Sequence, residues 1–188
     1  MCNVHSYDHD VRHQVIDKIV NKIKVRGNYL GLGGPIQSNE MKFINKVVDK
    51  GTAFILEKNR NYYNIWDDYA VDNNLNHIFP MNITFSKIIN TCLLKNRKVR
   101  CINIDFCKSI KSHCIDIMKA KQYLDNLGMP DFYKCLTGTV SVRGLDCSTK
   151  NSVNLLKALI HPDVEIYTYK STDHGRGVTM IRFFYQWK

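Results

Sequence analysis

Three features that often identify a class of protein are missing from this sequence. No two cysteines stand in a CxxC pair, so the spacing gives no support for a zinc ribbon. No apolar run approaches the roughly 20 residues that a helix needs to cross a bilayer. The first residues, MCNVHSYDHDVRH, lack the apolar segment of a secretory signal. We therefore expect a soluble protein that is not bound to a membrane.

The cysteines themselves indicate a reducing environment. There are seven, an odd number, and several fall within apolar runs where a free cysteine packs as a small hydrophobe. Without a secretory signal, we expect reduced thiols and a cytoplasmic, intracellular location.

Acidic residues are few compared with basic ones. The chain has 27 Lys and Arg against 17 Asp and Glu, which gives a formal net charge of +10 and a pI near 9.3. This balance favours a polyanionic partner such as RNA or DNA, although a generally basic soluble protein would show the same excess. Basic residues gather in LLKNRKVR (93–100) and KSIKSHCIDIMKAK (108–121), and aromatic ones in NYYNIWDDY (61–69). Such a combination suits a flipped-base enzyme or a single-strand binder, whereas LLKNRKVR alone is equally typical of a solvated connection.

Three histidines near the N-terminus have metal-like spacing. His5, His9 and His13 recur every four residues, which places their imidazoles on one face of a helix. The run is polar and has no second cluster of ligands, so we interpret these side chains as solvated and predict no metal site.

Helical and strand-like segments alternate along the chain. Helices are predicted within residues 10–25, 37–51, 61–74, 83–96, 109–128 and 148–161, and strands within 27–34, 52–57, 76–82, 99–107, 133–144, 163–171 and 178–187. Most strands are apolar on both faces, as in a parallel sheet covered on both sides. We predict an α/β fold with a mainly parallel twisted sheet, helices on both faces and a C-terminal antiparallel hairpin. Residues 1–26 form an N-terminal helical extension and 27–188 a Rossmann-like domain.

In such sheets, ligands bind outside the carboxyl ends of the strands. The first strand leads into GLGG (31–34), where glycines let the backbone approach a ligand, although a plain turn has the same composition. No Gly-Lys-Ser/Thr follows, which excludes a P-loop. The second strand is followed by Glu57, an acid placed to bind ribose hydroxyls or to remain solvated.

The fourth strand leads to Asp105 in CINIDFCKSI (101–110). A carboxylate that follows INI needs a partner, because burial of an unpaired charge is costly. Asp105 suits hydrogen bonding to an exocyclic amine or proton transfer from a hydroxyl. It also suits capping of the next helix, and these two interpretations are compatible.

With GLGG, Glu57 and NIDFCKS in this order, the chain resembles a class I S-adenosylmethionine-dependent methyltransferase over residues 27–188. IDFCKS is similar to the motif of tRNA guanine-N2 methyltransferases and, more distantly, of adenine-amino methyltransferases. The resemblance implies that S-adenosylmethionine binds near Gly31, Gly33 and Gly34, with its ribose on Glu57. It also implies that Asp105 orients the acceptor amine and that Phe106 stacks on a flipped base.

The motifs also differ from the family pattern. The acid that usually opens the glycine motif falls on Tyr29 or Leu30, and the proline that usually follows the motif acid is absent after Asp105. Asn82 is the polar candidate for the adenine amino group.

Three further residues near the motifs have alternative interpretations. Lys108 and Arg143 are candidate substrate contacts, Arg143 being equally compatible with plain surface charge. Cys107 has the chemistry of a pyrimidine C5 nucleophile, but packing is the simpler interpretation.

The sequence therefore favours a methyltransferase that acts on a base amino group of nucleic acid. A small-molecule or protein methyltransferase of the same fold is one alternative. A non-catalytic relative that binds cofactor or nucleic acid is the other.

Overall fold

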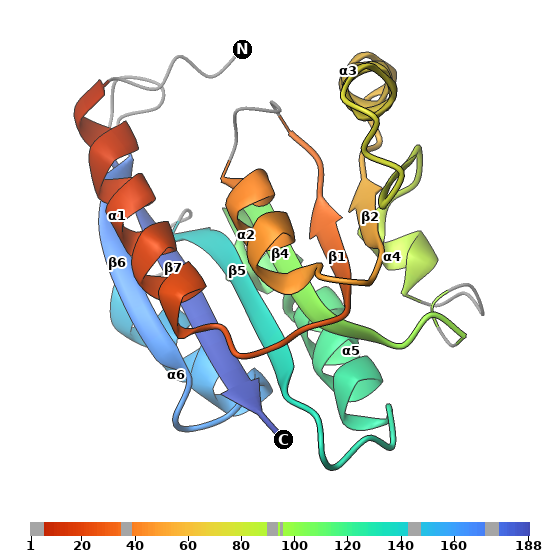
Figure 1. Ribbon diagram of the computed structural model, residues 1–188. Helices are drawn as coiled ribbons and strands as arrows, with labels where there is room; N and C mark the ends of the chain where they lie inside the picture. Colours follow the sequence, from red (N-terminus) through yellow and green to blue (C-terminus); the bar gives the residue numbers. More distant parts are fainter. Residues whose placement is uncertain (1–5, 35–38, 90–93, 95, 143–147, 172–176) are drawn as a thin grey trace.

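The computed structural model describes residues 6–34, 39–89, 94, 96–142, 148–171 and 177–188, with only the backbone described for 6–10, 107 and 108. It contains seven strands and six α-helices over these residues (Figure 1). The helices are α1 (Ser6–Lys22), α2 (Glu40–Val47), α3 (Arg60–Asp72), α4 (Phe85–Ile88), α5 (Cys114–Asp125) and α6 (Thr149–Leu159), with a 3₁₀ turn at Ile110–Ser112. The strands are β1 (Asn28–Leu32), β2 (Ala53–Leu56), β3 (Ile78–Met81), β4 (Val99–Ser109), β5 (Lys134–Val142), β6 (Glu165–Ser171) and β7 (Val178–Trp187).

The strands form one sheet in the order β3-β2-β1-β4-β5-β7-β6. The first five are mutually parallel, while β7 runs antiparallel to both β5 and β6. The predicted mainly parallel sheet with a closing antiparallel hairpin is therefore confirmed. The hairpin loop, residues 172–176, lies outside the described residues.

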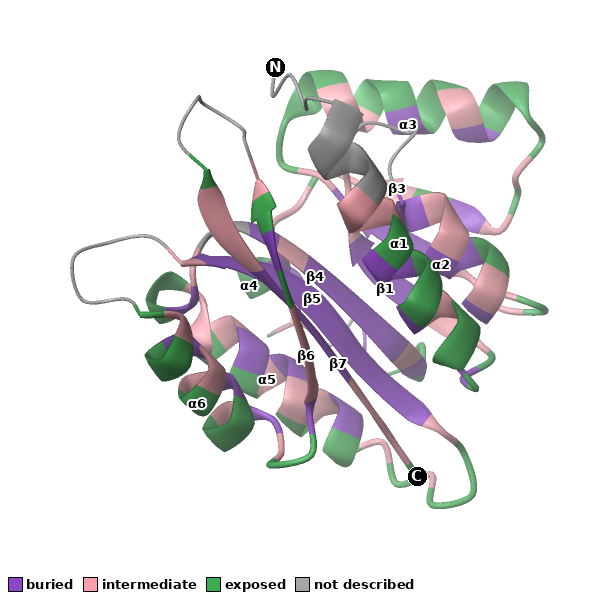
Figure 2. Cartoon of the chain, turned by 90° about the vertical axis from the view of Figure 1, so that its left-hand side faces the viewer, coloured by how far each residue is buried: buried purple, intermediate pink, exposed green. Residues whose placement is uncertain are grey.

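Helices cover both faces of the sheet, and the central strands between them are buried (Figure 2). Alternate strand residues point to opposite faces, so Leu30 packs with α4, α5 and α6 while its neighbour Tyr29 packs with α1, α2 and α3. The α3 helix packs on the sheet through Trp66, whose side chain is fully buried in the same cluster as Tyr29. The near-continuous apolar strands of the sequence reflect this burial on two sides.

The N-terminal helix packs on the body of the fold. Val15, Ile16 and Ile19 of α1 are buried in the same cluster as Phe43 and Ile44 of α2. The division at residues 26 and 27 into an extension and a domain stays a prediction.

Several elements differ in length from their predicted spans, and α4, predicted within residues 83–96, covers Phe85–Ile88. The α2 helix ends at Val47, before Gly51, because Val48 turns to extended backbone. Gly51 does not end the helix as predicted; it packs on Gly27, where a Cβ would lie 2.6 Å from the Gly27 carbonyl carbon. The β4 strand continues to Ser109, with its pairing to β5 irregular after Asp105. Asp105 therefore closes the regular part of β4.

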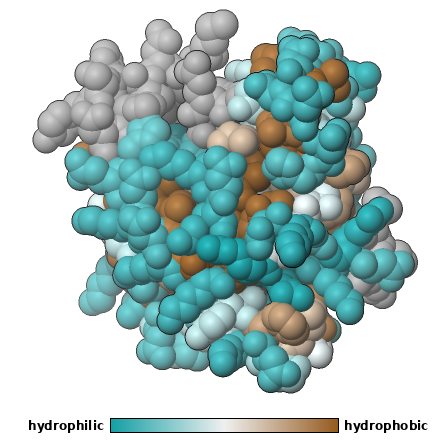
Figure 3. Space-filling model, viewed as in Figure 1, coloured by the Kyte–Doolittle hydropathy of each residue, from teal (hydrophilic) through white to brown (hydrophobic). Residues whose placement is uncertain are grey.

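Hydrophilic residues cover most of the face shown in Figure 3. Large exposed apolar side chains include Ile65 and Val71 of α3. In the part of the chain that the structure describes, no helix combines the length and apolar character that crossing a membrane requires.

The packing at the centre of the sheet gives a stability prediction. A Cβ at Gly138 of β5 would lie 2.3 Å from the Ile104 carbonyl oxygen and 2.7 Å from Phe183 Cζ. We expect Gly138→Ala to lower the free energy of unfolding by about 1–3 kcal/mol through overpacking, measured by urea denaturation. The control Gly177→Ala, whose Cβ would meet Lys170 Cδ at 4.0 Å, should change it by less than about 0.5 kcal/mol. Equal effects of the two substitutions would contradict this account of the packing.

Candidate functional site

The carboxyl ends of β1, β2 and β4 meet at one edge of the sheet, the upper edge in Figure 1. Leu32 of β1 pairs with Leu56 of β2, and Gly31 pairs with Asn103 of β4. The chain proceeds from β1 to β2 and β3 on one side and returns to β4 on the other. This reversal of direction next to β1 is where ligands bind in open α/β sheets.

Gly33 and Glu57 are in direct contact at this edge. The Gly33 N–H donates to the Leu56 carbonyl at 2.6 Å, and a Cβ on Gly33 would lie 2.8 Å from Glu57 Cβ. Only glycine fits this contact without displacement of the acid. Glu57 Oε1 accepts from the Asn59 N–H at 2.7 Å, whereas Oε2 has no donor among the described residues. The carboxylate therefore keeps one oxygen for a ligand.

Gly34 and Asn82 flank this contact. A Cβ on Gly34 would meet nothing within 4 Å, and the Gly34 carbonyl accepts from the buried Trp66 indole at 2.7 Å. Asn82 Nδ2 donates to the carbonyls of Glu57 at 2.9 Å and Lys58 at 3.3 Å. Four of the five predicted cofactor residues, Gly33, Gly34, Glu57 and Asn82, therefore lie at the ends of adjacent strands.

The fifth, Gly31, lies inside β1 and makes room for a side chain that the sequence analysis missed. A Cβ at Gly31 would lie 1.6 Å from Glu40 Oε1. Glu40 opens α2 and is only 5% exposed. Gly31 therefore admits the Glu40 carboxyl above β1.

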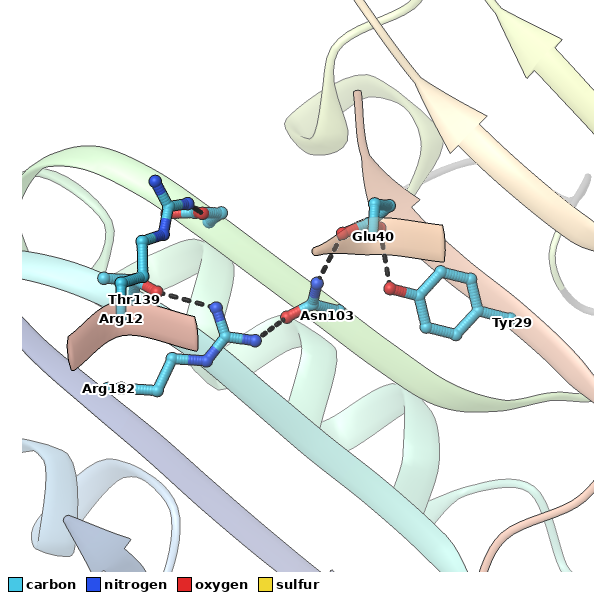
Figure 4. A network of polar contacts seen from close by, with 7 residues as sticks. Arg12, Tyr29, Glu40, Asn103, Thr139 and Arg182 are labelled. Carbon is cyan, nitrogen blue, oxygen red and sulfur yellow. Dashed lines mark hydrogen bonds and ion pairs between the residues drawn. The ribbon is translucent and has the colours of Figure 1, made fainter. Parts of the chain in front are cut away.

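Glu40 belongs to a buried row of polar groups across the sheet (Figure 4). Its carboxyl accepts from the Tyr29 hydroxyl at 2.6 Å and from Asn103 Nδ2 at 2.7 Å. Arg182 donates to Asn103 Oδ1 at 2.6 Å and to Thr139 Oγ1 at 2.8 Å. Each of these five side chains is at most 5% exposed. We call this row the Glu40 network, and it links α2 to β1, β4, β5 and β7.

Asp105 pairs with an arginine from the N-terminal helix. Arg12 Nη2 of α1 lies 2.5 Å from Asp105 Oδ2, and both side chains are partly exposed. Asp105 thus faces α1, on the same side of the sheet as the Glu40 network. Its other oxygen, Oδ1, has no donor among the described residues.

Phe106 faces the opposite side of the sheet. Its ring stacks on His113 with centroids 3.7 Å apart and an interplanar angle of 6°, and it meets Phe85 of α4 edge-on. Phe106 is 8% exposed. A base that stacked on this face of Phe106 would have to displace His113.

Comparison with solved structures identifies the fold. Precorrin-6y C5,15-methyltransferase from Geobacter metallireducens superposes with a TM-score of 0.57, at 16% identity over 93% of this chain and 87% of that one. A SAM-dependent methyltransferase from Agrobacterium tumefaciens gives 0.59, at 11% identity over 96% and 62%. An rRNA methylase from Streptococcus thermophilus gives 0.55, at 7% identity over 92% and 94%. No protein-family model matches the chain, and no curated protein does. The chain has the class I methyltransferase fold.

The sequence placed the acid that usually opens the glycine motif on Tyr29 or Leu30, and both side chains are buried in β1. The structure supplies a carboxyl group to the same place from α2, since Tyr29 donates its hydroxyl to Glu40. Glu40 carried no sequence signal beyond its place in the first turn of a helix. Arg182 did carry one, because a charged residue within the apolar run VTMIRFFYQW requires a buried partner.

Several predicted residues cannot be placed. Arg143 lies outside the described residues, and of Lys108 and Cys107 only the backbone of β4 is described. Among the three N-terminal histidines, only the side chain of His13 is described.

The Glu40 network has a pH-dependent consequence. Burial raises the pKa of Glu40 from about 4.5 to about 7, against the opposing effects of the Tyr29 hydrogen bond and the charge of Arg182. Between these two values the folded chain binds a proton at Glu40 that the unfolded chain does not bind. This contribution to stability is therefore fully present below pH 4.5 and is lost as the pH rises through about 7.

We therefore expect Glu40→Gln to remove a pH-dependent component from the stability of the chain. The rise in the pKa of Glu40 from 4.5 to about 7 corresponds to a loss of about 3 kcal/mol in the free energy of unfolding as the pH rises through this range. Gln remains compatible with the site, because the Tyr29 hydroxyl can accept from its amide. Urea denaturation between pH 5 and 8 should show wild-type stability falling more steeply than that of the variant. Parallel pH profiles of the two proteins would contradict the raised pKa.

Proposed function

We propose that this chain is an S-adenosylmethionine-dependent methyltransferase that acts on nucleic acid at a base amino group. The observation that carries the proposal is the contact of Gly33 with Glu57 at the carboxyl ends of β1 and β2. Asp105 closes the regular part of the adjacent strand β4. A glycine turn, an acid and a second acid thus lie in this order at the ligand-binding edge of a class I fold.

The residues at this edge suit the cofactor. Glu57 Oε2 accepts from no donor in the described part of the chain, which leaves it available to a ribose hydroxyl. Gly34 leaves open space where a side chain would stand. Asn82 uses its N–H groups on the β2 connection, which leaves its side-chain oxygen as acceptor for the adenine amine. We assign cofactor binding to these residues, and we expect the Gly33 backbone to contact the cofactor directly. Gly31 would contribute indirectly, because it makes room for Glu40 in the Glu40 network.

When bound, the cofactor supplies a methyl group on a sulfonium, a leaving group that needs no acid. The chain therefore acts mainly by orienting the acceptor, which supplies much of the rate acceleration in such displacements. Asp105 would accept a hydrogen bond from the acceptor amine through Oδ1. Arg12 would hold the carboxylate in position through Oδ2.

Phe106 would act indirectly in this proposal. Its buried ring stacks on His113, the residue before α5, so it would hold the start of α5 against β4. We therefore assign Phe106 a positioning role.

The nucleic-acid substrate is supported by charge. A net charge of +10 attracts a polyanion, and one of the compared solved structures is described as an rRNA methylase. Lys108 and Arg143 stay predicted contacts to this substrate. A reducing, cytoplasmic location agrees with the free, buried thiols of Cys101 and Cys135, which pair in register across β4 and β5.

The ion pair of Arg12 with Asp105 favours a second candidate function. A guanidinium 2.5 Å from the proposed acceptor-binding carboxylate occupies one of its oxygens. In a non-catalytic relative, this pair would be structural, and the chain would bind cofactor without methyl transfer.

Substitution of Glu57 tests cofactor binding. Glu57→Gln keeps an oxygen for the Asn59 N–H but loses the charge that strengthens hydrogen bonds to a ribose. We expect the dissociation constant for S-adenosylhomocysteine to rise about 10-fold or more in calorimetry, since hydrogen bonds to charged groups contribute about 1.5–3 kcal/mol. Asp163→Ala, a change to an exposed carboxylate, is the control and should leave it unaltered. Unchanged affinity in Glu57→Gln would remove Glu57 from the site.

Substitution of Asp105 tests catalysis. We expect Asp105→Ala to bind cofactor normally but to transfer methyl-tritium label to tRNA, rRNA or DNA about 100-fold more slowly. Arg12→Gln breaks the same ion pair and keeps the carboxylate, so it should transfer at least about 10-fold faster than Asp105→Ala. Equal losses in the two variants would show that only the ion pair matters. Cofactor binding by the wild-type chain without transfer to any of the acceptors would establish the non-catalytic function instead.

A further inference from the structure

A basic pocket lies at the opposite edge of the sheet, where β1 and β4 begin. It has a volume of about 300 Å³, and its lining includes Gly27, Asn28, Lys50, Arg97, Lys98 and Arg100. We call it the amino-edge pocket. These residues come from the first residues of β1 and β4 and from the connections that precede β1, β2 and β4.

Hydrogen bonds through Asn28 hold the three connections together. Asn28 Oδ1 accepts from the Thr52 N–H at 2.8 Å, and Asn28 Nδ2 donates to the Arg97 carbonyl. The contact of Gly51 with Gly27 brings the β1 and β2 connections closer than any side chain would allow. The pocket is therefore a defined part of the fold rather than a chance gathering of surface lysines.

Contacts within the protein hold one of the basic side chains of the pocket, Arg100, in place. The Arg100 side chain lies across Gly27, donates to the Arg26 carbonyl at 3.3 Å and sits 3.9 Å from the centroid of the Phe132 ring. Arg97 and Lys98 are exposed at the tip of the turn, where Lys98 has a left-handed backbone with φ of 47°. An arginine held over an aromatic ring keeps the rest of its guanidinium edge for a ligand.

The ion pairs of the described residues involve none of these charges. Within the described ranges, no carboxylate lies within 4 Å of Lys50, Arg97, Lys98 or Arg100. The other lining residues, Gly27, Asn28, Gly51 and Asn96, carry no charge. Four positive charges around one concavity attract an anion with several negative charges.

We propose that the amino-edge pocket binds backbone phosphates of the nucleic-acid substrate, at a distance from the reacting base. This inference rests on the proposed function and adds a second contact region to it. Gly33 lies five positions after Asn28 along the chain, which corresponds to about 17 Å at 3.3 Å per strand residue. This length equals about five phosphates along one strand of a duplex. The substrate is therefore a polynucleotide that extends well beyond the modified nucleotide.

The salt dependence of RNA binding tests the pocket. We compare wild type with the double variant Arg97→Gln/Lys98→Gln by fluorescence anisotropy of a labelled single-stranded 24-mer RNA. The control is Lys150→Gln/Lys157→Gln on α6, which removes the same charge from exposed positions. We expect the pocket variant to bind about 10- to 30-fold more weakly near 0.1 M salt. Its slope of log K against log salt should be shallower by roughly 1.4, since each contact with a single strand contributes about 0.7. The control should stay close to wild type.

Equal losses of RNA affinity and of salt slope in the two double variants would overturn the inference, because binding would then depend on the net charge of the chain and not on the pocket. Saturable binding of inorganic pyrophosphate to wild type but not to the pocket variant, with the RNA slope unchanged, would also overturn it in favour of a small-anion site. Calorimetry with S-adenosylhomocysteine separates this inference from the proposed function. Absence of cofactor binding in wild type would refute that function, whereas failure of the pocket alone would leave cofactor binding intact in every variant.

Discussion

Buried hydrogen bonds join Glu40 to Tyr29, Asn103 and, through Asn103, Arg182, and they tie α2 to the centre of the sheet. Buried polar groups of this kind need partners, because an unpaired one costs several kcal/mol. Their mutual satisfaction therefore fixes the start of α2 over β1 and β4. Glu40 stands six positions after Gly34 in the chain, so the network also limits where the glycine turn can lie. Gly31 is required for the same reason, since any side chain there would displace the carboxyl group.

The layout of the fold was predictable because it follows from local patterns. Apolar strands alternating with amphipathic helices indicated the sheet, and the acid after β2 and the glycines after β1 indicated its ligand-binding edge. What the sequence did not reveal are contacts between distant residues. Arg12 and Asp105 are 93 positions apart, and Glu40 and Asn103 are 63 apart. The resemblance implied that Phe106 and Asp105 contact the same base, yet consecutive residues of a strand point to opposite faces of the sheet.

In the proposed function, the two edges of the sheet would bind different parts of the reactants. At the carboxyl edge, Glu57 would hold the cofactor and Asp105 the acceptor amine, while α1 reaches this edge through Arg12. At the amino edge, Arg97, Lys98 and Arg100 would hold the nucleic-acid backbone. Such a division would let one sheet contribute both cofactor binding and substrate affinity.

The central claim is that the carboxyl ends of β1 and β2 bind S-adenosylmethionine. A crystal structure of the chain with S-adenosylhomocysteine tests it most directly. We expect the ribose hydroxyls within hydrogen-bonding distance of the Glu57 carboxylate and the ligand in contact with Gly33 and Gly34. A ligand bound elsewhere, or none at saturating concentration, would contradict it.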